Sequence, residues 1–303
     1  MKPILFIDRD GTLIREPEDE QVDTLEKLEF LPRVMQSLNK IRSLTNYLLV
    51  IVSNQDGMGT DSFPMRDFKL VNDKMIQTFE NEGIIFDSAF YDDSFPEDNK
   101  PTRKPGIAML KQYLNGEFDL SSSFVIGDRQ SDIQLAKNLG CRGIFIGEDE
   151  AVSSDDLKDI CPLITKEWSE IADFVIKESR KSQITRVTSE TNINIELYLD
   201  GKGNSEISTG TGFFDHMLEQ IAKHGGIDLQ IKAKGDTWVD EHHLIEDVGI
   251  TLGKAIAEAL GNKAGINRYG FALPMDDCSA QVMIDFGGRS YLVWKADFNR
   301  EKI

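Results

Sequence analysis

Two aspartates stand two residues apart just after an apolar run near the N-terminus. The run ILFID ends at Asp8, and the segment DRDGT carries Asp8 and Asp10. If the chain stays extended through Asp8, both carboxylates can turn toward one crevice. A carboxylate is a poor nucleophile toward a phosphate monoester unless a cation screens the repulsion. Mg²⁺ does this, and it prefers one or two carboxylates plus substrate phosphate as ligands. The pair therefore indicates magnesium-assisted chemistry on a phosphate.

Other polar residues suited to the same chemistry follow later apolar runs. Asp128 ends the run SFVIGD, and Asp132 in the next turn adds a further carboxylate. Ser53 and Asn54 end the run YLLVIVSN, and both can donate hydrogen bonds to phosphoryl oxygens. Lys104 in RKPG supplies a point charge suited to the transferring group. These residues are candidates for one shared site.

The elements that would position them alternate regularly over residues 1–147. Apolar runs alternate with segments of helical spacing, which indicates a parallel sheet covered on both faces. Ligands of such sheets lie beyond the carboxyl ends of the strands, where the polar residues above stand. The predicted strands are 4–8, 47–54, 84–91, 123–128 and 142–147, and the predicted helices are 33–44, 67–82, 107–114 and 133–139.

The segments DRDGT, SNQ, RKP and GDRQSD occur in this order on successive predicted strands. Asp, Gly and Asn can also mark turns and helix caps, but the four segments together resemble the motifs of haloacid-dehalogenase-like phosphatases. That resemblance implies an aspartyl-phosphate on Asp8 and a general acid, then base, at Asp10. It further implies Mg²⁺ held by Asp8, Asp10 and Asp128, and the phosphoryl group bound by Ser53, Asn54 and Lys104.

All four histidines lie within residues 216–243. His242 and His243 are four and three residues before Glu246, so each shares a helix face with it. The two imidazoles differ by about 100° around a helix, so they face two ions more readily than one. His216 on the preceding predicted helix could add a ligand. Imidazole with carboxylate suits Mn²⁺, Fe²⁺ or Zn²⁺ better than Mg²⁺. The pattern predicts a metal site, although a lone HH pair is usually a surface feature.

The pattern of polar and apolar residues changes near residue 182. An acidic, loop-like stretch at 148–159 precedes this change. The order beyond it reads strand, helix, strand, helix, strand, which predicts an α+β region. The segments FFDHM, DEHHLIED, GINRYGF and LPMDDC resemble imidazoleglycerol-phosphate dehydratases. That resemblance implies manganese ligands at His216, His242, His243 and Glu246, and substrate contacts from Glu190, Arg268 and Arg289.

Taken over the whole chain, the motifs resemble the bifunctional family that joins a histidinol-phosphate phosphatase to such a dehydratase. The resemblance implies a phosphatase domain at 1–165, a linker at 166–182 and the first half of a dehydratase domain at 183–303. It implies small phosphorylated imidazole compounds as substrates, and homo-oligomers among full-length members. Because the dehydratase unit is duplicated in that family and one HHxxE segment is present here, we expect phosphatase activity without dehydratase activity for these 303 residues.

Two alternatives remain open at this point. The phosphatase motifs alone also fit another small phosphate monoester, with an inactive C-terminal region. The second alternative is a metal-dependent hydrolase that acts through HHLIE. However, Asp247 stands where an HxxEH pattern would have histidine. Some relatives carry a zinc-binding loop before RKP. This chain has Asp92, Ser94, Lys100 and Thr102 there, so no Zn²⁺ is expected.

Composition excludes several other classes. The formal net charge of −18 disfavours binding to nucleic acid, which needs a basic face. No apolar run approaches the roughly 18 residues of a membrane helix, so no membrane partner is expected. The three cysteines are too few and too scattered for a disulfide framework. A cytoplasmic location is expected.

Overall fold

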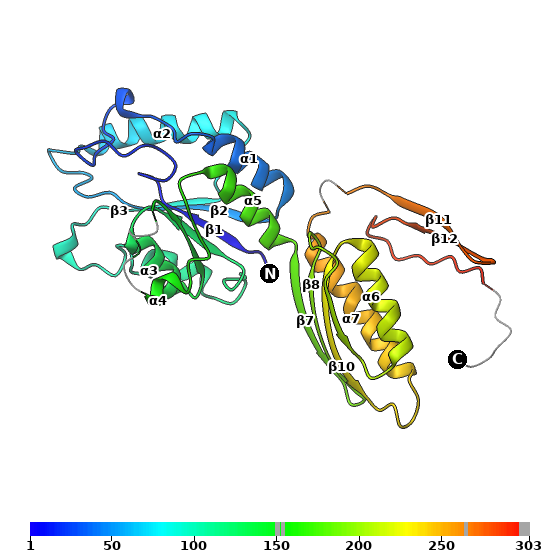
Figure 1. Ribbon diagram of the computed structural model, residues 1–303. Coiled ribbons are helices and arrows are strands. Elements are labelled where there is room, and N and C mark those ends of the chain that lie inside the picture. Colours follow the sequence, from blue (N-terminus) through cyan, green and yellow to red (C-terminus); the bar gives the residue numbers. More distant parts are fainter. Residues whose placement is uncertain (149–151, 153–154, 264–265, 297–303) are drawn as a thin grey trace. The chain divides into compact units, whose positions relative to one another are not determined.

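A six-stranded parallel sheet organises the N-terminal region, in the order β3-β2-β1-β4-β5-β6. Figure 1 shows the computed structural model, which describes residues 1–148, 152, 155–263 and 266–296. The predicted parallel sheet is confirmed, with one strand more than expected. The strands are β1 (Ile4–Ile7), β2 (Leu48–Asn54), β3 (Ser88–Asp92), β4 (Phe124–Gly127), β5 (Arg142–Ile146) and β6 (Leu163–Thr165).

Helices cover both faces of this sheet (Figure 1). Alternate residues of β1 lie in two different cores: Leu5 and Ile7 in one, Ile4 and Phe6 in the other. Both faces are therefore buried, which is why the strands are apolar throughout. The first core is completed by α1 (Val34–Leu44), α2 (Met65–Asn81) and α5 (Trp168–Ser179), and the second by α3 (Gln130–Leu139) and the 3₁₀ helix η3 (Ala108–Tyr113). Shorter elements are η1 (Leu25–Lys27), η2 (Pro96–Asp98) and α4 (Asp155–Lys158).

Two predicted elements differ from the structure. The strand expected at 84–91 begins only at Ser88, because Ile84 closes the end of α2, where its N–H donates to Phe79 O at 2.9 Å. A buried apolar residue after a helix end is typical of such caps. The helix expected at 107–114 is a 3₁₀ helix, with i to i+3 bonds such as Leu110 N to Ile107 O.

Residues 166–182, expected to be a linker, contain helix α5. Its buried residues Trp168, Ile171, Ala172 and Val175 have the spacing of one apolar helix face. All four belong to the first core of the six-stranded sheet. The acidic stretch before it lies partly outside the described residues, at 149–151 and 153–154.

A second sheet of four strands follows, in the order β7-β8-β10-β9. Two helices pack against one of its faces and bury Ile193, Ile195 and Leu197 of β8. The predicted α+β region is confirmed, and β9, which pairs in parallel with β10, was not predicted. The elements are β7 (Lys181–Val187), β8 (Thr191–Tyr198), β9 (Ser205–Ser208), α6 (Gly212–Gly225), β10 (Asp228–Gly235) and α7 (His242–Leu260).

Residues Lys263–Ile303 form a separate unit. Its described part is an antiparallel hairpin of β11 (Tyr269–Met275) and β12 (Cys278–Ile284). β12 was predicted, whereas β11 was missed because its sequence contains Pro274, which is unusual within a strand. Over the described ranges of the chain, no helix is long and apolar enough to cross a membrane.

Candidate functional site

The carboxyl ends of three neighbouring strands meet at one edge of the six-stranded sheet. Asp8 follows β1, Ser53 and Asn54 end β2, and Asp128 follows β4. The Asp8 N–H donates to Ile126 O at 2.9 Å, which anchors the end of β1 to β4. A cavity of about 100 Å³ opens here. Its lining includes Asp8, Asp10, Glu16, Asp19, Glu20, Gln21, Ser53, Asn54, Gln55, Asp56, Phe63, Lys104, Arg129 and Ser131.

Lys104 lines this cavity and is 4% exposed. Its Nζ is 2.7 Å from Asp8 Oδ1 and 2.7 Å from Asp132 Oδ1. Burial alone would lower the pKa of Lys104, but the Asp132 and Asp8 carboxylates outweigh it and hold that pKa above its ordinary value. The lysine is therefore a fixed cation beside Asp8.

Asp8, Asp128 and Asp132 form an acidic cluster in which one oxygen of each lies within 4.8 Å of the others. Burial, together with the Asp8 and Asp132 charges, raises the pKa of Asp128 to about 8. Within the described chain, the buried Asp128 Oδ1 has no hydrogen-bond partner. A side chain at Gly11 would meet Asp128 Oδ2 at 2.1 Å, so the glycine leaves this space open. Hard carboxylate ligands with an unsatisfied oxygen fit a Mg²⁺ ion.

Asp10, also predicted as a metal ligand, has its carboxylate outside this acidic cluster. Its Oδ1 accepts a hydrogen bond from Arg9 Nη1 at 2.6 Å, and its Oδ2 accepts one from Gln55 Nε2. Its side chain is 12% exposed and lines the cavity. Asp10 therefore lies in the cavity lining, outside the clustered oxygens.

Asn54 contacts the main chain of Lys104 in both directions. Asn54 Oδ1 accepts from Lys104 N at 2.9 Å, and Asn54 Nδ2 donates to Lys104 O at 3.3 Å. In this structure its amide therefore holds the lysine segment, whereas the sequence predicted a direct contact with phosphate. That predicted contact stays a prediction.

The loop in the place of a zinc-binding loop is held by hydrogen bonds. Asp92 accepts hydrogen bonds from the Ser94 N–H and hydroxyl, and Thr102 also hydrogen-bonds to it. Arg103 makes a bidentate ion pair with Asp56, in which Nη2 lies 3.0 Å from Oδ2. Arg103 also donates a hydrogen bond to Ser94 O. These bonds connect the loop to the segment after β2.

The predicted manganese ligands are not gathered into one group within the part of the chain that the structure describes. His216 Nδ1 lies 3.8 Å from Glu219 on α6. His242 Nδ1 contacts Asp240, and His243 Nδ1 is 3.2 Å from Asp236. Glu246, one turn further along α7, is exposed. The described residues therefore do not present a Mn²⁺ site.

The predicted substrate-binding residues of the C-terminal region are exposed. Glu190 lies in the turn between β7 and β8, where Ser189 donates to it at 2.7 Å. Arg268 precedes β11 and pairs with Asp285 at 2.7 Å within the hairpin unit, and Arg289 follows β12. Their roles remain predictions.

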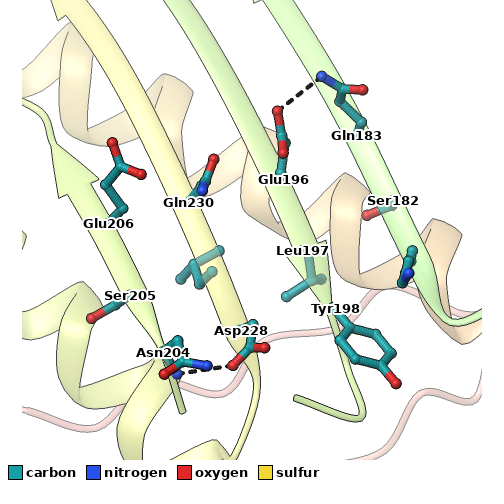
Figure 2. Close-up of a pocket in the computed structure, with 12 residues that line it drawn as sticks. Ser182, Gln183, Glu196, Leu197, Tyr198, Asn204, Ser205, Glu206, Asp228 and Gln230 are labelled. Atoms are coloured by element: carbon teal, nitrogen blue, oxygen red, sulfur yellow. Dashed lines mark hydrogen bonds between the residues drawn. The ribbon is translucent and has the colours of Figure 1, made fainter. Parts of the chain in front are cut away.

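A wider hollow of about 570 Å³ lies over the face of the four-stranded sheet opposite its helices. Figure 2 shows its polar side chains standing on separate strands. Glu196 accepts from Gln183 at 3.1 Å, and Asp228 accepts from the Asn204 N–H at 2.9 Å (Figure 2). Because these carboxylates are spread apart and hydrogen-bonded, the hollow lacks the concentrated charge seen beside Asp8.

Comparisons with known proteins match both regions. The family described as HAD-hydrolase-like matches residues 101–164, and the family described as imidazoleglycerol-phosphate dehydratase matches residues 209–303. The histidine biosynthesis bifunctional protein HisB of Bacteroides fragilis is 54% identical over 305 residues, covering 100% of this chain and 82% of the relative. The chain belongs to this family of bifunctional histidine-biosynthesis proteins. The family's member from Spirosoma linguale is 51% identical over 314 residues, with the same two coverages.

A solved structure agrees with the family's N-terminal fold. The D,D-heptose 1,7-bisphosphate phosphatase from B. bronchiseptica, complexed with magnesium and phosphate, aligns with a TM-score of 0.52 and 22% identity. The alignment covers 59% of this chain and 99% of that chain. Together with the family assignment, this confirms the predicted haloacid-dehalogenase-like region followed by a dehydratase-like one.

Two buried residues beside the site were not predicted from the sequence to belong to it. Arg9 and Gln55 both contact Asp10. Both residues belong to the segments DRDGT and SNQ, from which the site was predicted. Those segments were therefore the only indication in the sequence that Arg9 and Gln55 lie near the site. Nothing in their spacing shows that both side chains converge on Asp10, because that contact depends on how β1 and β2 pair.

Proposed function

We propose that the N-terminal region hydrolyses L-histidinol phosphate to histidinol and phosphate. The observation that carries this proposal is Asp8, which lies against the Lys104 ammonium and within the acidic cluster. A carboxylate beside a fixed cation and a metal-binding group is equipped to attack phosphorus. Membership of the family supports the choice of substrate.

Asp8 and Asp128 would hold Mg²⁺, with Asp132 behind them bonded to Lys104. When bound, this ion would screen the phosphate charge and favour attack by a carboxylate. Asp10 would not contribute its carboxylate in the observed arrangement.

The reaction then proceeds in two steps through this chain's own residues. An Asp8 oxygen attacks phosphorus and forms an aspartyl-phosphate, while Asp10 donates a proton to the departing alcohol oxygen. Asp10 then accepts a proton from water, which attacks the phosphorus and releases phosphate and free Asp8. Lys104 and the Ser53 hydroxyl would stabilise the charge on the phosphoryl oxygens.

The lining of the cavity favours a substrate with a positive charge away from its phosphate. Beyond Asp8 and Asp10, its lining carries four carboxylates, from Glu16, Asp19, Glu20 and Asp56. Two cations, Lys104 and Arg129, line the same cavity, and three of the four carboxylates are ion-paired: Glu16 with Arg129, Asp19 with Lys27 and Asp56 with Arg103. The lining still carries more carboxylates than cations. An amine or imidazolium would therefore be attracted to it, and the second phosphate of a bisphosphate would be repelled. Histidinol phosphate has the favoured charge pattern.

A substrate panel tests this proposal. Release of phosphate from L-histidinol phosphate, a heptose bisphosphate and an uncharged alkyl phosphate would be measured with Mg²⁺. We expect histidinol phosphate to give the highest kcat/KM, and Asp8→Asn to abolish its turnover while the circular dichroism spectrum is unchanged. Turnover retained by Asp8→Asn would rule out the assigned nucleophile, and a preference for the bisphosphate would rule out the substrate.

The family description over residues 209–303 supports a second activity. We propose that this region contributes to the Mn²⁺-dependent dehydration of imidazole glycerol phosphate to imidazole acetol phosphate in the cytoplasm, as part of a homo-oligomer of chains with the full length of its relatives. The 303-residue polypeptide alone should lack this activity. His216, His242, His243, Glu246 and the predicted substrate contacts Glu190, Arg268 and Arg289 are the candidates. A dehydratase assay on the 303-residue polypeptide, with and without Mn²⁺, tests it directly. We expect no dehydration at any Mn²⁺ concentration, and a rate above background would contradict the proposal.

A further inference from the structure

Gln55 lies buried between two groups that the proposed reaction uses. Its side chain follows β2 and is 4% exposed. Gln55 Nε2 donates to Asp10 Oδ2, the proposed proton donor, and to Ser53 Oγ at 2.8 Å. A primary amide nitrogen carries two protons, so each of these acceptors can receive one.

Arg9 fixes which way the amide of Gln55 points. Arg9 is completely buried, and its Nη1 lies 3.3 Å from Gln55 Oε1 and 2.6 Å from Asp10 Oδ1. A guanidinium can only donate hydrogen bonds, so the oxygen of the amide must face Arg9. The amide nitrogen must then face Asp10 and Ser53. Both oxygens of the Asp10 carboxyl are thereby held, one by Arg9 and one by Gln55.

The same contact sets the direction of the Ser53 hydroxyl. Because Ser53 Oγ accepts a hydrogen bond from Gln55, its own proton must point elsewhere. Ser53 and Gln55 both line the cavity beside Asp8, so this proton is available to a phosphoryl oxygen.

We propose that Gln55 is a positioning residue that aligns the Asp10 carboxyl for proton transfer and the Ser53 hydroxyl for the phosphoryl group. This inference rests on the proposed phosphatase function. It goes beyond that function in assigning one amide to the alignment of both groups.

The inference predicts a specific dependence on the leaving group. An alkyl alcohol leaves phosphorus readily only when it receives a proton, whereas p-nitrophenolate leaves without one. Misalignment of Asp10 should therefore slow an alkyl phosphate more than an aryl phosphate. A loss of packing alone would slow both equally.

The test compares two substrates in the full chain loaded with Mg²⁺. Gln55→Met keeps the length of the side chain and removes both donors. We expect its kcat/KM for L-histidinol phosphate, which reports the first step, to fall about 100-fold, in the range typical of general acid catalysis, and its kcat/KM for p-nitrophenyl phosphate to fall about 10-fold or less. Gln77→Met, an exposed position on α2, is the matched control and should match wild type.

An equal fall on both substrates, or no fall, would overturn the inference. If Gln55→Met fails to fold by circular dichroism, Gln55→Leu provides the second variant, because its apolar side chain also cannot donate a hydrogen bond. It should show the same unequal loss. A wild-type enzyme that cleaves aryl phosphates but not histidinol phosphate would contradict the proposed substrate only. Gln55 would then be tested on aryl phosphates of rising leaving-group pKa, where the variant must show the steeper loss. A wild-type enzyme inert toward every monoester would overturn both.

Discussion

The indole Nε1 of Trp168 donates a 2.8 Å hydrogen bond to the main-chain oxygen of Thr12. Trp168 opens helix α5 and is 1% exposed, and Thr12 closes the segment DRDGT that carries Asp8 and Asp10. The two residues are 156 positions apart in the chain. Helix α5 therefore supports the loop on which the proposed nucleophile stands.

Replacing this tryptophan tests that support. Trp168→Phe keeps an aromatic ring in the core but leaves the buried Thr12 oxygen without its donor. We expect the free energy of unfolding in urea to fall by about 1–3 kcal/mol, and kcat of the phosphatase to fall with it. Trp238→Phe, at a position 81% exposed, is the control and should shift stability by no more than about 0.5 kcal/mol. Equal behaviour of the two variants would contradict the role of α5.

The acidic cluster predicts how stability depends on pH. The pKa of Asp128 is raised from 3.8 to about 8, mainly by burial and by Asp8 and Asp132. Between those values the folded chain binds more protons than the unfolded chain. The free energy of unfolding of the metal-free protein should therefore fall as pH rises through this window and level off above it.

Mg²⁺ should reverse this trend, because it replaces the proton on the cluster. The stabilisation by Mg²⁺ should therefore grow between about pH 5 and about pH 8, as measured by thermal unfolding. In Asp128→Asn both the pH slope and the gain from Mg²⁺ should shrink. A metal-free protein that gains stability over this window would contradict the assignment.

The ion pair between Arg103 and Asp56 predicts that phosphatase activity falls even when Arg103 is replaced by a residue of the same charge. Arg103→Lys keeps the charge but cannot make two parallel hydrogen bonds to one carboxylate. Because Arg103 precedes Lys104, we expect kcat/KM for histidinol phosphate to fall about tenfold, which corresponds to about 1.4 kcal/mol. Arg66→Lys changes an arginine whose side chain is 94% exposed and should leave the kinetics unchanged. Wild-type kinetics in Arg103→Lys would show that the Asn54 contacts alone hold the lysine segment.

Metal content provides a further check. The described residues contain one group of possible metal ligands, the acidic cluster. The loop at the place of the relatives' zinc-binding loop is held by hydrogen bonds instead. We expect the isolated 303-residue polypeptide to bind Mn²⁺ only at the cluster, so that Asp128→Asn removes binding and His242→Asn does not, as measured by electron paramagnetic resonance. Elemental analysis should find no stoichiometric zinc. Zinc held by residues 85–105 would overturn the second expectation.

The sequence predicted the sheet and the strand ends because local patterns carry that information. The runs ending at Asp8 and Asn54 are apolar throughout, which is typical of strands buried on both faces. Since parallel strands present their carboxyl ends on one edge, the convergence of Asp8, Ser53 and Asp128 followed from topology alone.

Contacts that depend on tertiary packing could not be predicted in the same way. The short amphipathic stretch around Trp168 gave no sign that its indole reaches Thr12. Asn54 was expected to face phosphate, but its amide fits the Lys104 main chain once the two segments are adjacent. Strand β6 was likewise not predicted, because it has only three residues and follows an acidic, loop-like stretch.

The most direct test of the account is to find which residue carries the phosphoryl group. The Mg²⁺-loaded enzyme would be quenched in acid during turnover of histidinol phosphate, and acyl phosphates would be reduced with borohydride, which converts a phosphorylated aspartate to homoserine. Peptide mass spectrometry should locate homoserine at position 8 in the wild type and at no position in Asp8→Asn. Homoserine at position 10, 128 or 132, or a phosphorylated histidine instead, would contradict the assignment of Asp8.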